Sequence, residues 1–570
     1  MPIIPIAEWR PDVSDYAGQT TKTVLNVYPR GDGYGPVANL LAYTAALPAA
    51  CRGFFYARKA DGTVQVFAGT VDRLYTLNNT TQTWVPVSKT ATVTISSASP
   101  GVVTLVAHGF AANDPVAFYN SGGALPAAIT AGTVYYVKTV LSADTFTISA
   151  TAGGTAINTA STGTGTHSVT WIYSSLSANA HWQFRQFNNF VFAVQGNVNP
   201  QVYDLTTSSS FADLGGSPPQ AAYVSIVNRF VVLSGIASPN AYRVQWSGLN
   251  ATTTWTSGVS QSDYQDLADG GAVMGVAGGE FGTIFQASAI RRMVFAPGSP
   301  YVFGIDRIST DDGLLAPYSL ISAQDRIFFL SPQGFKMLLP GAYPTPIGKE
   351  RVDRTFFEDV DTSNLQMVIG ASDPTSTRVY WAYKSINGPA GQFDKMLAYD
   401  WALDKFTPIS IGGEFIASLS RPGITLEGVD AAYGSNLDTL TISSLDNISS
   451  AAYAQLSGVD TSHKAGFFNG SNLEATLETP EQSGDGRKMF VRGFRPVTDA
   501  PTIYGSVTYR DTPQATASTS SESLVSSRTG MCNFRVPTSR YFRAINRIPA
   551  GTTWTYLTGV EPDANAEGKV

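Results

Sequence analysis

FFYARKADGTVQVF (54–67) and DRLYTLNNTTQTW (72–84) together form one unit of a pattern that recurs along this chain. Two short apolar strands meet at a turn, a further apolar strand follows, and an aromatic edge ends the unit. The pattern returns at 187–205, 227–246, 325–339 and 377–409. The sequence therefore predicts an array of β-meanders.

The spacing of these units is about 35–50 residues, the range of propeller blades and similar arrays. Each unit is too small to bury its own apolar face, so the copies must pack against one another. The expected fold is all-β, a β-propeller of six or seven blades with additional β modules.

The chain has 570 residues, 43% of them hydrophobic and 14% charged, and a formal net charge of −6. The hydrophobic content is sufficient for packed cores, while so little charge is typical of adhesins and virus particles more often than of cytosolic enzymes. A net negative charge argues against nucleic-acid binding across the whole surface.

Cys51 and Cys532 are the only cysteines and lie far apart, so we expect two free, buried thiols. The first residues, MPIIPIAEWRPD, do not show a basic region followed by an apolar core. The apolar stretch 37–50 is broken by Tyr43 and Pro48 and is too short for a bilayer. The sequence predicts neither a secretion signal nor a membrane anchor.

Changes in proline content, residue alternation and strand length along the chain predict four parts. Proline-rich residues 1–50 are expected to be extended and to close the propeller, which takes up 51–88 and 171–445. Residues 89–170 alternate independently and predict an inserted β-barrel, whose flanks read as one broken blade. Longer strands in 446–570 predict a C-terminal β-sandwich. The best candidate helix is NISSAAYAQL, which lies within 435–458.

Residues suited to catalysis or metal binding do not form a recognisable pattern. The histidines are His108, His167, His181 and His463. None of them has a second potential ligand at metal-binding spacing or a cysteine nearby in the sequence. The chain also lacks a nucleophile elbow, a Walker loop and a dinucleotide fingerprint. We therefore expect no catalytic, cofactor-binding or metal-binding residues and a protein that is not an enzyme.

One partial motif points towards glycosidases. Ser309, Asp311 and Gly313 match the first half of the S-x-D-x-G-x-T-W turn of sialidase-like propellers, but Leu315 and Ala316 replace its Thr and Trp. An ordinary Asp-Gly turn is the favoured interpretation.

A group of acids in ERVDRTFFEDVDTS suggests a possible acid–base pair. The acids are Asp353, Glu358, Asp359 and Asp361. Because Arg351 and Arg354 are interspersed in the same stretch, we expect a solvated, self-paired segment.

Three segments together resemble one protein family. The first is NVYPRGDGYG (26–35), and the second is the run of blades containing DRIFFLSPQGF (325–335) and MLAYDW (396–401). The third is the ending, GRKMFVRGFRPVTD (486–499) followed by TSRYFRAINRIPAGTTWTYLTGVEPD (538–563). Their order is similar to that of the tail hub or nozzle proteins of short-tailed bacteriophages, also called packaged-DNA stabilisation proteins.

This resemblance implies a propeller with a β-sandwich that assembles as a homo-oligomeric ring, usually a hexamer, below the portal and adaptor rings. Such a ring extends or closes the tail channel and retains packaged DNA until ejection. The implied partners are the head–tail adaptor ring, tail fibre or tailspike proteins, and DNA that passes through the lumen without sequence recognition. The implied location is the virion tail, after assembly in the host cytoplasm.

The insert carries a separate resemblance. Residues 108–157 look like a small β-barrel module of phage tail proteins and, distantly, like the half-domain near the catalytic cysteine of ubiquitin-activating enzymes. Since this insert has no cysteine, the likeness implies a fold and no activity.

A local excess of positive charge suggests an assembly interface near the end of the chain. From Arg487 to Arg547 ten Lys or Arg residues stand against three acids. In a strand, Tyr541, Arg543 and Arg547 share one face and Arg540 points to the other. Arginine and tyrosine are enriched in interface cores, so we expect Arg540, Tyr541, Arg543 and Arg547 to meet an acidic surface of a neighbouring subunit or the adaptor. The alternative is an exposed basic edge that discourages aggregation.

Two other function classes stay open. One is a glycan-binding or glycan-cleaving tail or surface protein whose tryptophans stack on sugars; the candidates are Trp84, Trp171, Trp182, Trp246 and Trp255. The other is an extracellular propeller that binds proteins.

Overall fold

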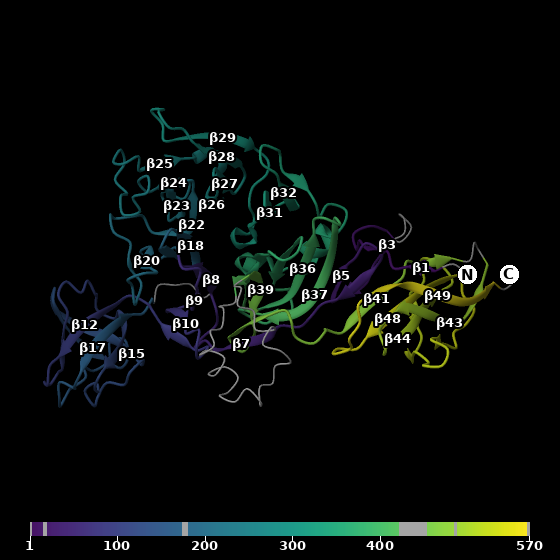
Figure 1. Cartoon of the computed structure of the whole chain (residues 1–570), viewed down its shortest axis with the longest axis horizontal. Coiled ribbons are helices and arrows are strands. Elements are labelled where there is room, and N and C mark those ends of the chain that lie inside the picture. Colours follow the sequence, from purple (N-terminus) through teal and green to yellow (C-terminus); the bar gives the residue numbers. More distant parts are fainter. Residues whose placement is uncertain (1–2, 15–19, 174–179, 421–452, 484–486, 567–570) are drawn as a thin grey trace. The chain divides into compact units, whose positions relative to one another are not determined.

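The computed structural model describes residues 3–14, 20–173, 180–420, 453–483 and 487–566 (Figure 1). The chain is all-β. Within the described residues the helices are α1 (Asp353–Asp359) and the short 3-10 helices η1 (Ala268–Gly270), η2 (Pro317–Ser319) and η3 (Thr362–Met367). The chain divides into two compact units, one formed by Met1–Tyr43, Leu314–Leu419 and Ala454–Val570 and the other by Thr44–Gly313 and Ser420–Tyr453.

The second unit contains four sheets, each an antiparallel meander of four consecutive strands. The first sheet comprises β8 (Gly53–Arg58), β9 (Val64–Gly69), β10 (Leu74–Leu77) and β11 (Trp84–Pro86). The next comprises β18 (Gln183–Phe187), β19 (Phe190–Val194), β20 (Gln201–Asp204) and β21 (Ala212–Asp213). The third comprises β22 (Ala221–Val227), β23 (Phe230–Ile236), β24 (Arg243–Trp246) and β25 (Asp263–Asp266). The fourth comprises β26 (Val273–Ala277), β27 (Gly282–Gln286), β28 (Ile290–Phe295) and β29 (Phe303–Ser309).

Three further sheets of the same kind lie wholly or mostly in the first unit. The fifth comprises β30 (Ile321–Ala323), β31 (Arg326–Ser331), β32 (Gly334–Leu338) and β33 (Thr345–Pro346). The sixth comprises β34 (Ile369–Asp373), β35 (Arg378–Tyr383), β36 (Phe393–Asp400) and β37 (Lys405–Gly413). The seventh comprises β38 (Phe415–Ser420), β39 (Ala454–Val459), β40 (Lys464–Phe467) and, from the N-terminal segment, β7 (Leu41–Ala46). Among the described residues, these seven four-stranded meanders are the blades of a β-propeller.

Tight hairpins explain the first two strands of several blades. Phe187 pairs with Phe190 and Val227 pairs with Phe230, which leaves two residues for each turn. Such turns need a left-handed residue, and Asn188 and Asn228 both have φ of 53°. Asparagine tolerates this conformation better than most residues, so the sequence favours a hairpin at these places.

The apolar cores lie between successive sheets instead of in one centre. The first and second sheets share a cluster that contains Phe67, Trp182 and Phe184. The sixth and seventh share another, around Tyr380 and Ile416. Within each unit, neighbouring blades therefore bury their faces against one another.

The inserted module is a closed barrel of six strands within the described residues. Its strands are β12 (Thr90–Ile95), β13 (Val102–Thr104), β14 (Pro115–Ser121), β15 (Val134–Ser142), β16 (Thr145–Ser149) and β17 (Thr166–Trp171). Phe118 and Phe146 are fully buried in a cluster drawn from the barrel alone. One expectation is wrong: the flanks are not halves of a broken blade, because β11 completes the first sheet before the barrel begins.

We expect that replacing 90–171 with Gly-Ser leaves the rest of the chain folded. The barrel has its own core, and its first and last strands pair at Thr90 and Thr170, so the two cut ends lie side by side. Far-ultraviolet circular dichroism and thermal unfolding of the deletion variant should show intact β-structure and a Tm within a few degrees of the full chain. Aggregation of the variant would show that the barrel is part of the propeller core.

The C-terminal sandwich has two sheets. One comprises β47 (Cys532–Asn533), β43 (Met489–Thr498), β49 (Leu557–Ala566), β6 (Tyr34–Pro36), β5 (Val27–Pro29) and β1 (Ile4–Pro5). The other comprises β4 (Val24–Leu25), β41 (Ala475–Glu478), β42 (Gln482–Ser483), β48 (Tyr541–Ile548), β44 (Tyr504–Arg510), β45 (Ser518–Thr519) and β46 (Ser523–Leu524). Outside both sheets, β2 (Glu8–Trp9) pairs with β3 (Thr20–Thr21).

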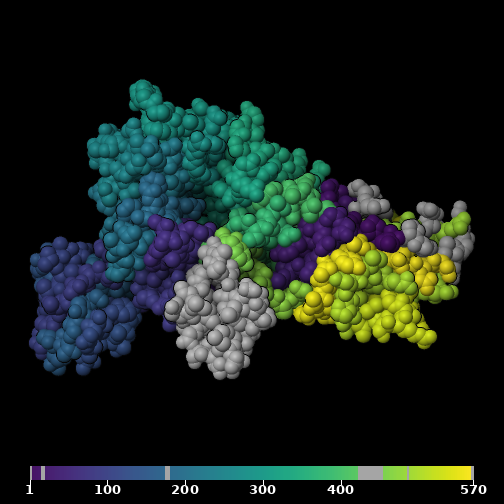
Figure 2. Space-filling model, viewed as in Figure 1, coloured from purple at the N-terminus to yellow at the C-terminus, as the bar shows by residue number. Residues whose placement is uncertain are grey.

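These assignments correct two expected boundaries. The sandwich does not begin at 446, because β39 and β40 complete a blade. Residues 1–50 do more than extend along the propeller: β7 is the outer strand of the seventh blade, while β1, β4, β5 and β6 belong to the sandwich. Figure 2 shows the purple N-terminal residues packed against the yellow C-terminal ones. The candidate helix lies mostly outside the described residues, and its end is the strand Ala454–Val459.

Asn26 joins the sixth blade to the sandwich. Its backbone N–H donates to the carbonyl of Pro408 (3.1 Å), and its Oδ1 accepts from the N–H of Ser410 (2.7 Å). Its Nδ2 donates to the carbonyl of Glu474, the residue before β41 (2.8 Å). With φ of 59° and only 7% exposure, Asn26 combines a left-handed backbone with contacts on both sides. These bonds link blade and sandwich within the first unit.

Candidate assembly interface

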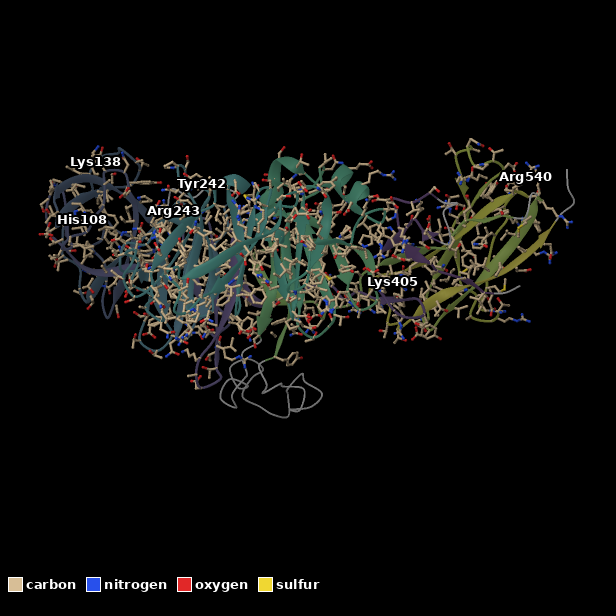
Figure 3. The ribbon with its side chains drawn as sticks, turned by 90° about the horizontal axis from the view of Figure 1, so that it is seen from above. His108, Lys138, Tyr242, Arg243, Lys405 and Arg540 are labelled. Carbon is tan, nitrogen blue, oxygen red and sulfur yellow. The ribbon has the colours of Figure 1, made fainter. Side chains whose placement is uncertain are left out.

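Strand β48 carries three of the four residues expected at an interface. Burial alternates along it, with Phe542, Asn546 and Ile548 buried and Arg543 and Arg547 partly exposed. Tyr541 and both arginines therefore lie on one face of the strand. Arg540 immediately precedes the strand and is labelled in Figure 3.

Arg547 is held by two carboxylates of its own chain. Its Nε and Nη2 donate to the two carboxylate oxygens of Glu522 at 2.8 and 2.7 Å, and its Nη1 donates to Glu474 at 2.9 Å. The guanidinium also lies 4.5 Å from the ring centroid of Tyr504. The hydrogen bonds from Arg547 hold the pKa of Glu522 below its usual value. This bidentate geometry is the strong form of an ion pair.

Arg543 and Arg510 share a second acidic group on the same face. Arg510 donates to both oxygens of Glu481, at 2.7 and 2.6 Å. Arg543 lies 3.7 Å from Glu478 and 3.8 Å from Glu481. The side chain of Glu481 is only 6% exposed, so this ion pair is largely buried. Arg510 also approaches the ring of Tyr541, with 5.9 Å to the centroid.

The expected basic face is therefore charge-compensated within the chain, which corrects the sequence expectation. Three arginines (Arg510, Arg543, Arg547) face four glutamates (Glu474, Glu478, Glu481, Glu522). Three of these glutamates precede Arg487, where the counted charge window began; they lie in β41 or within three residues of its ends, and β41 pairs with β48. Antiparallel pairing of β41 with β48, with Thr476 opposite Arg547, supplies the acids that the local count missed.

The tryptophans proposed for sugar stacking occupy two kinds of environment. Trp182, Trp246 and Trp255 are 2–4% exposed, and their indole N–H groups donate to the carbonyls of Thr70, Gln261 and Thr252. Buried rings of this kind close a blade and have no face for a sugar.

The two other tryptophans are less buried. Trp171 lies between Phe110, 4.7 Å away between centroids, and the ammonium of Lys89, 4.3 Å from the ring centroid. Trp84 is partly exposed and donates to the carbonyl of Ala45. A sugar-stacking role for Trp171 would require Lys89 to move.

The acidic group around α1 is only partly self-paired. Arg354 lies 3.9 Å from Glu358, as expected, but Asp359 pairs with Lys395 (2.8 Å) and Asp361 with Lys384 (2.9 Å). The expectation of a solvated stretch is wrong for the fourth acid of the group, Asp353.

Asp353 is 9% exposed and accepts a hydrogen bond from the N–H of Phe335 (3.0 Å). Burial raises the pKa of Asp353 to about 6, and the nearby Asp12 adds to the increase. Gly334 and Gly348 approach its carboxylate so closely that a Cβ at either position would collide with it.

We expect the substitution Asp353→Asn to stabilise the protein at pH 8 by about 2–3 kcal/mol and to have little effect near pH 4. At low pH the Asp353 carboxyl is protonated in both the folded and the unfolded chain. As the pH rises from about 4 towards 6, this carboxyl ionises more readily in the unfolded chain than in the folded one. The raised pKa therefore destabilises the wild-type protein at high pH. Urea denaturation at several pH values measures this difference.

Asp359→Asn is the matched control, since it removes acceptors for Lys395 and Tyr383 and should destabilise at pH 8. A pH-independent effect of Asp353→Asn would contradict the assignment.

The remaining candidate residues are structural. Cys51 and Cys532 are free and buried, as predicted, and burial raises the pKa of Cys532 to about 11. Ser309 donates to Asp312 (3.2 Å) in the turn after β29. Across the described parts of the chain, no group of three or more His, Cys, Asp or Glu residues is arranged to hold a metal ion. Within the same ranges, no helix is both long and apolar enough to cross a bilayer.

Comparisons with known proteins return structural likenesses only. No protein-family model matches the chain, and no curated protein matches it. A chain of the mitotic checkpoint complex is 8% identical with a TM-score of 0.32, and the match covers 68% of this chain and 91% of that one. BamB from Moraxella catarrhalis is 12% identical with a TM-score of 0.21, covering 56% of this chain and 99% of that one. YCF48 from Cyanidioschyzon merolae is 8% identical with a TM-score of 0.23, covering 53% and 84%. Because these scores are low, the sheet pairing of the chain itself carries the fold assignment.

Proposed function

We propose that this protein is a structural component of a short bacteriophage tail. It forms a homo-oligomeric ring, a hexamer, below the portal and adaptor rings, where it extends or closes the DNA channel and retains packaged DNA until ejection. It contacts the adaptor ring and tail fibre or tailspike proteins, and DNA passes through its lumen without sequence recognition. In this role the protein needs no active site.

The observation that best supports this proposal concerns the segments that resemble the hub and nozzle family. Residues 26–35 contain Asn26, β5 and part of β6, while 486–499 contain β43 and 538–563 contain β48 and most of β49. In this chain β6 pairs with β49, β49 pairs with β43, and Asn26 bonds Glu474, which immediately precedes β41. The first and third of the resembling segments therefore lie in one sandwich, which supports the proposal that they form a module of the kind found in that family.

Native mass spectrometry of the purified chain, with electron microscopy, tests the proposal. The expected result is a closed ring of six copies that also assembles onto tail-deficient particles. A monomer at all concentrations that fails to join particles would contradict it. A monomer that binds an oligosaccharide on a glycan array would instead favour the glycan-binding function.

The face of β48 needs its own test, because its arginines already have partners. Reversing Arg543 and Arg547 to Glu would gather carboxylates on one sheet and unfold it, so that variant does not isolate assembly. The double substitution Arg547→Gln with Glu522→Gln removes both charges and keeps hydrogen-bonding groups. If this face meets a neighbouring subunit, the double variant loses ring formation while its Tm stays within a few degrees of the wild type. Normal rings would show that the face serves only the sandwich.

A further inference from the structure

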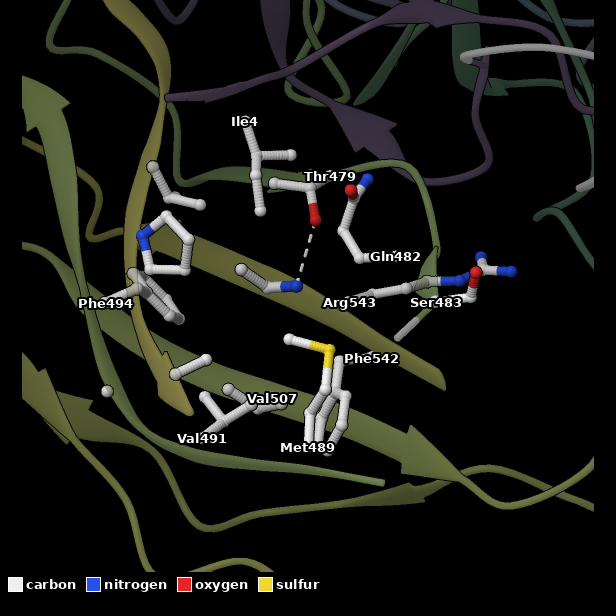
Figure 4. A pocket seen from close by; sticks show the side chains of 15 residues that line it. Ile4, Thr479, Gln482, Ser483, Met489, Val491, Phe494, Val507, Phe542 and Arg543 are labelled. Atoms are coloured by element: carbon white, nitrogen blue, oxygen red, sulfur yellow. Dashed lines mark hydrogen bonds between the residues drawn. The ribbon is translucent and has the colours of Figure 1, made fainter. Parts of the chain in front are cut away.

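A cavity of about 490 Å³ lies between the two sheets of the sandwich (Figure 4). Its walls come from β1, β43 and β49 on one side and from β42, β44 and β48 on the other. All of these strands belong to the first unit. The cavity is therefore a feature of the sandwich alone.

The walls of this cavity are mostly apolar. Phe494, Val507, Phe542 and Val560 line it and are 1–5% exposed, and all four belong to one core cluster of the sandwich. Protein interiors are normally packed as densely as organic crystals. Apolar walls hold water poorly, since a bound water needs several polar partners. This space is open to solvent at one end and continuous with an apolar core, and it has the dimensions and lining of a ligand site.

One end of the cavity is polar. Thr479, Gln482, Ser483 and Arg543 lie together there, away from Phe494, Val491 and Val507 (Figure 4). The Thr479 hydroxyl accepts from the N–H of Ala544 (3.0 Å), and the Gln482 amide donates to the carbonyl of Pro480 (3.1 Å). An amide and two hydroxyls can bond a ligand head while its chain lies along the apolar walls.

The charges near the polar end of the cavity determine which kind of ligand head group can bind there. Arg543 forms part of the cavity wall, but its guanidinium lies beside Glu478 and Glu481 on the face of β48 opposite Phe542. An anionic head at the polar end would therefore leave water without gaining a cation as its partner. A neutral head avoids this cost.

We propose that the sandwich cavity binds an uncharged amphiphile with a single aliphatic chain, such as an alcohol. The aliphatic chain of the ligand lies between Val491, Phe494, Val507 and Phe542. Its hydroxyl head forms hydrogen bonds at the polar end of the cavity, near Thr479 and Gln482. This site is independent of the ring function proposed above, because every residue that forms it lies inside one sandwich.

Competition binding to the full chain tests the proposal. The fluorescent probe is neutral N-phenyl-1-naphthylamine, displaced by 1-hexanol, 1-octanol and 1-decanol, with decanoate as the anionic compound of equal length. Burial of two methylenes is expected to strengthen binding by roughly tenfold along the alcohol series. Decanoate is expected to bind at least about tenfold more weakly than 1-decanol, because its carboxylate would be desolvated without a cation as its partner. Equal binding of the two, or no displaceable probe, would overturn the proposal.

Two variants locate the binding. Ala564 lines the cavity and is 8% exposed, so Ala564→Phe should fill it and weaken 1-decanol binding at least tenfold. Ala515→Phe, at an exposed position outside the lining, should leave binding unchanged. If Ala564→Phe unfolds, Met489→Ala provides a second test, because a wider cavity should shift the preference towards longer alcohols. If the folded lining variant, Ala564→Phe or Met489→Ala, binds the alcohols as the wild type does, the ligand binds elsewhere and this site is excluded.

Discussion

The substitution Trp182→Ala is expected to lower the free energy of unfolding by about 3–5 kcal/mol, among the largest single effects in this chain. Trp182 is 2% exposed and packs in the cluster shared by the first two blades. Its indole N–H donates to the carbonyl of Thr70 (2.9 Å), and its backbone N–H donates to the carbonyl of Arg52 (2.6 Å). Gly53 and Gly69 leave the space that its ring and backbone occupy. Truncation therefore leaves a cavity that two glycines cannot fill.

Urea denaturation followed by far-ultraviolet circular dichroism measures this loss. Trp84→Ala is the matched control, because Trp84 is partly exposed at the outer strand of the first blade. Its substitution should cost only roughly 1 kcal/mol. Equal losses for the two variants would show that Trp182 does not join the blades.

The second large effect is expected at Arg510. The substitution Arg510→Met should destabilise the sandwich by about 3–5 kcal/mol, because it leaves the buried carboxylate of Glu481 without its bidentate partner. Arg543, 3.8 Å away, cannot replace both hydrogen bonds at that distance.

A double variant separates the ion pair from general packing. Arg510→Met with Glu481→Leu removes both charges and should recover most of the lost stability, since two apolar side chains leave no buried charge. Thermal unfolding of the single and double variants gives the comparison. A double variant as unstable as Arg510→Met would mean that packing around the arginine stem, not the charge, matters most.

The repeat was readable because each blade is built mostly from consecutive strands, so its alternation and turns lie within one short stretch. The seventh blade was harder to predict. Its outer strand β7 precedes all the others in the chain, and β38 and β39 are separated by more than thirty residues. A local pattern cannot reveal a sheet that is assembled from distant segments.

The same reason explains the missed charges and the buried acid. Arg547 looked unpaired because its partner Glu474, the residue before β41, precedes the counted window. Asp353 looked solvated because its neighbours in sequence are charged, yet it is covered by Gly334 and Gly348, which leave room for the carboxylate. Alternation within β48 was predictable, since it depends only on the period of a strand.

The pairing of β12 with β17 has a consequence for how such a chain can diverge. The barrel enters and leaves through neighbouring residues, Thr90 and Thr170, and follows a blade that is already complete. Recombination at this point can exchange the barrel for another module, or lose it, without changing the register of any blade. The junction is therefore a natural cassette site, at which related chains can acquire new surfaces while the propeller sequence on either side is retained.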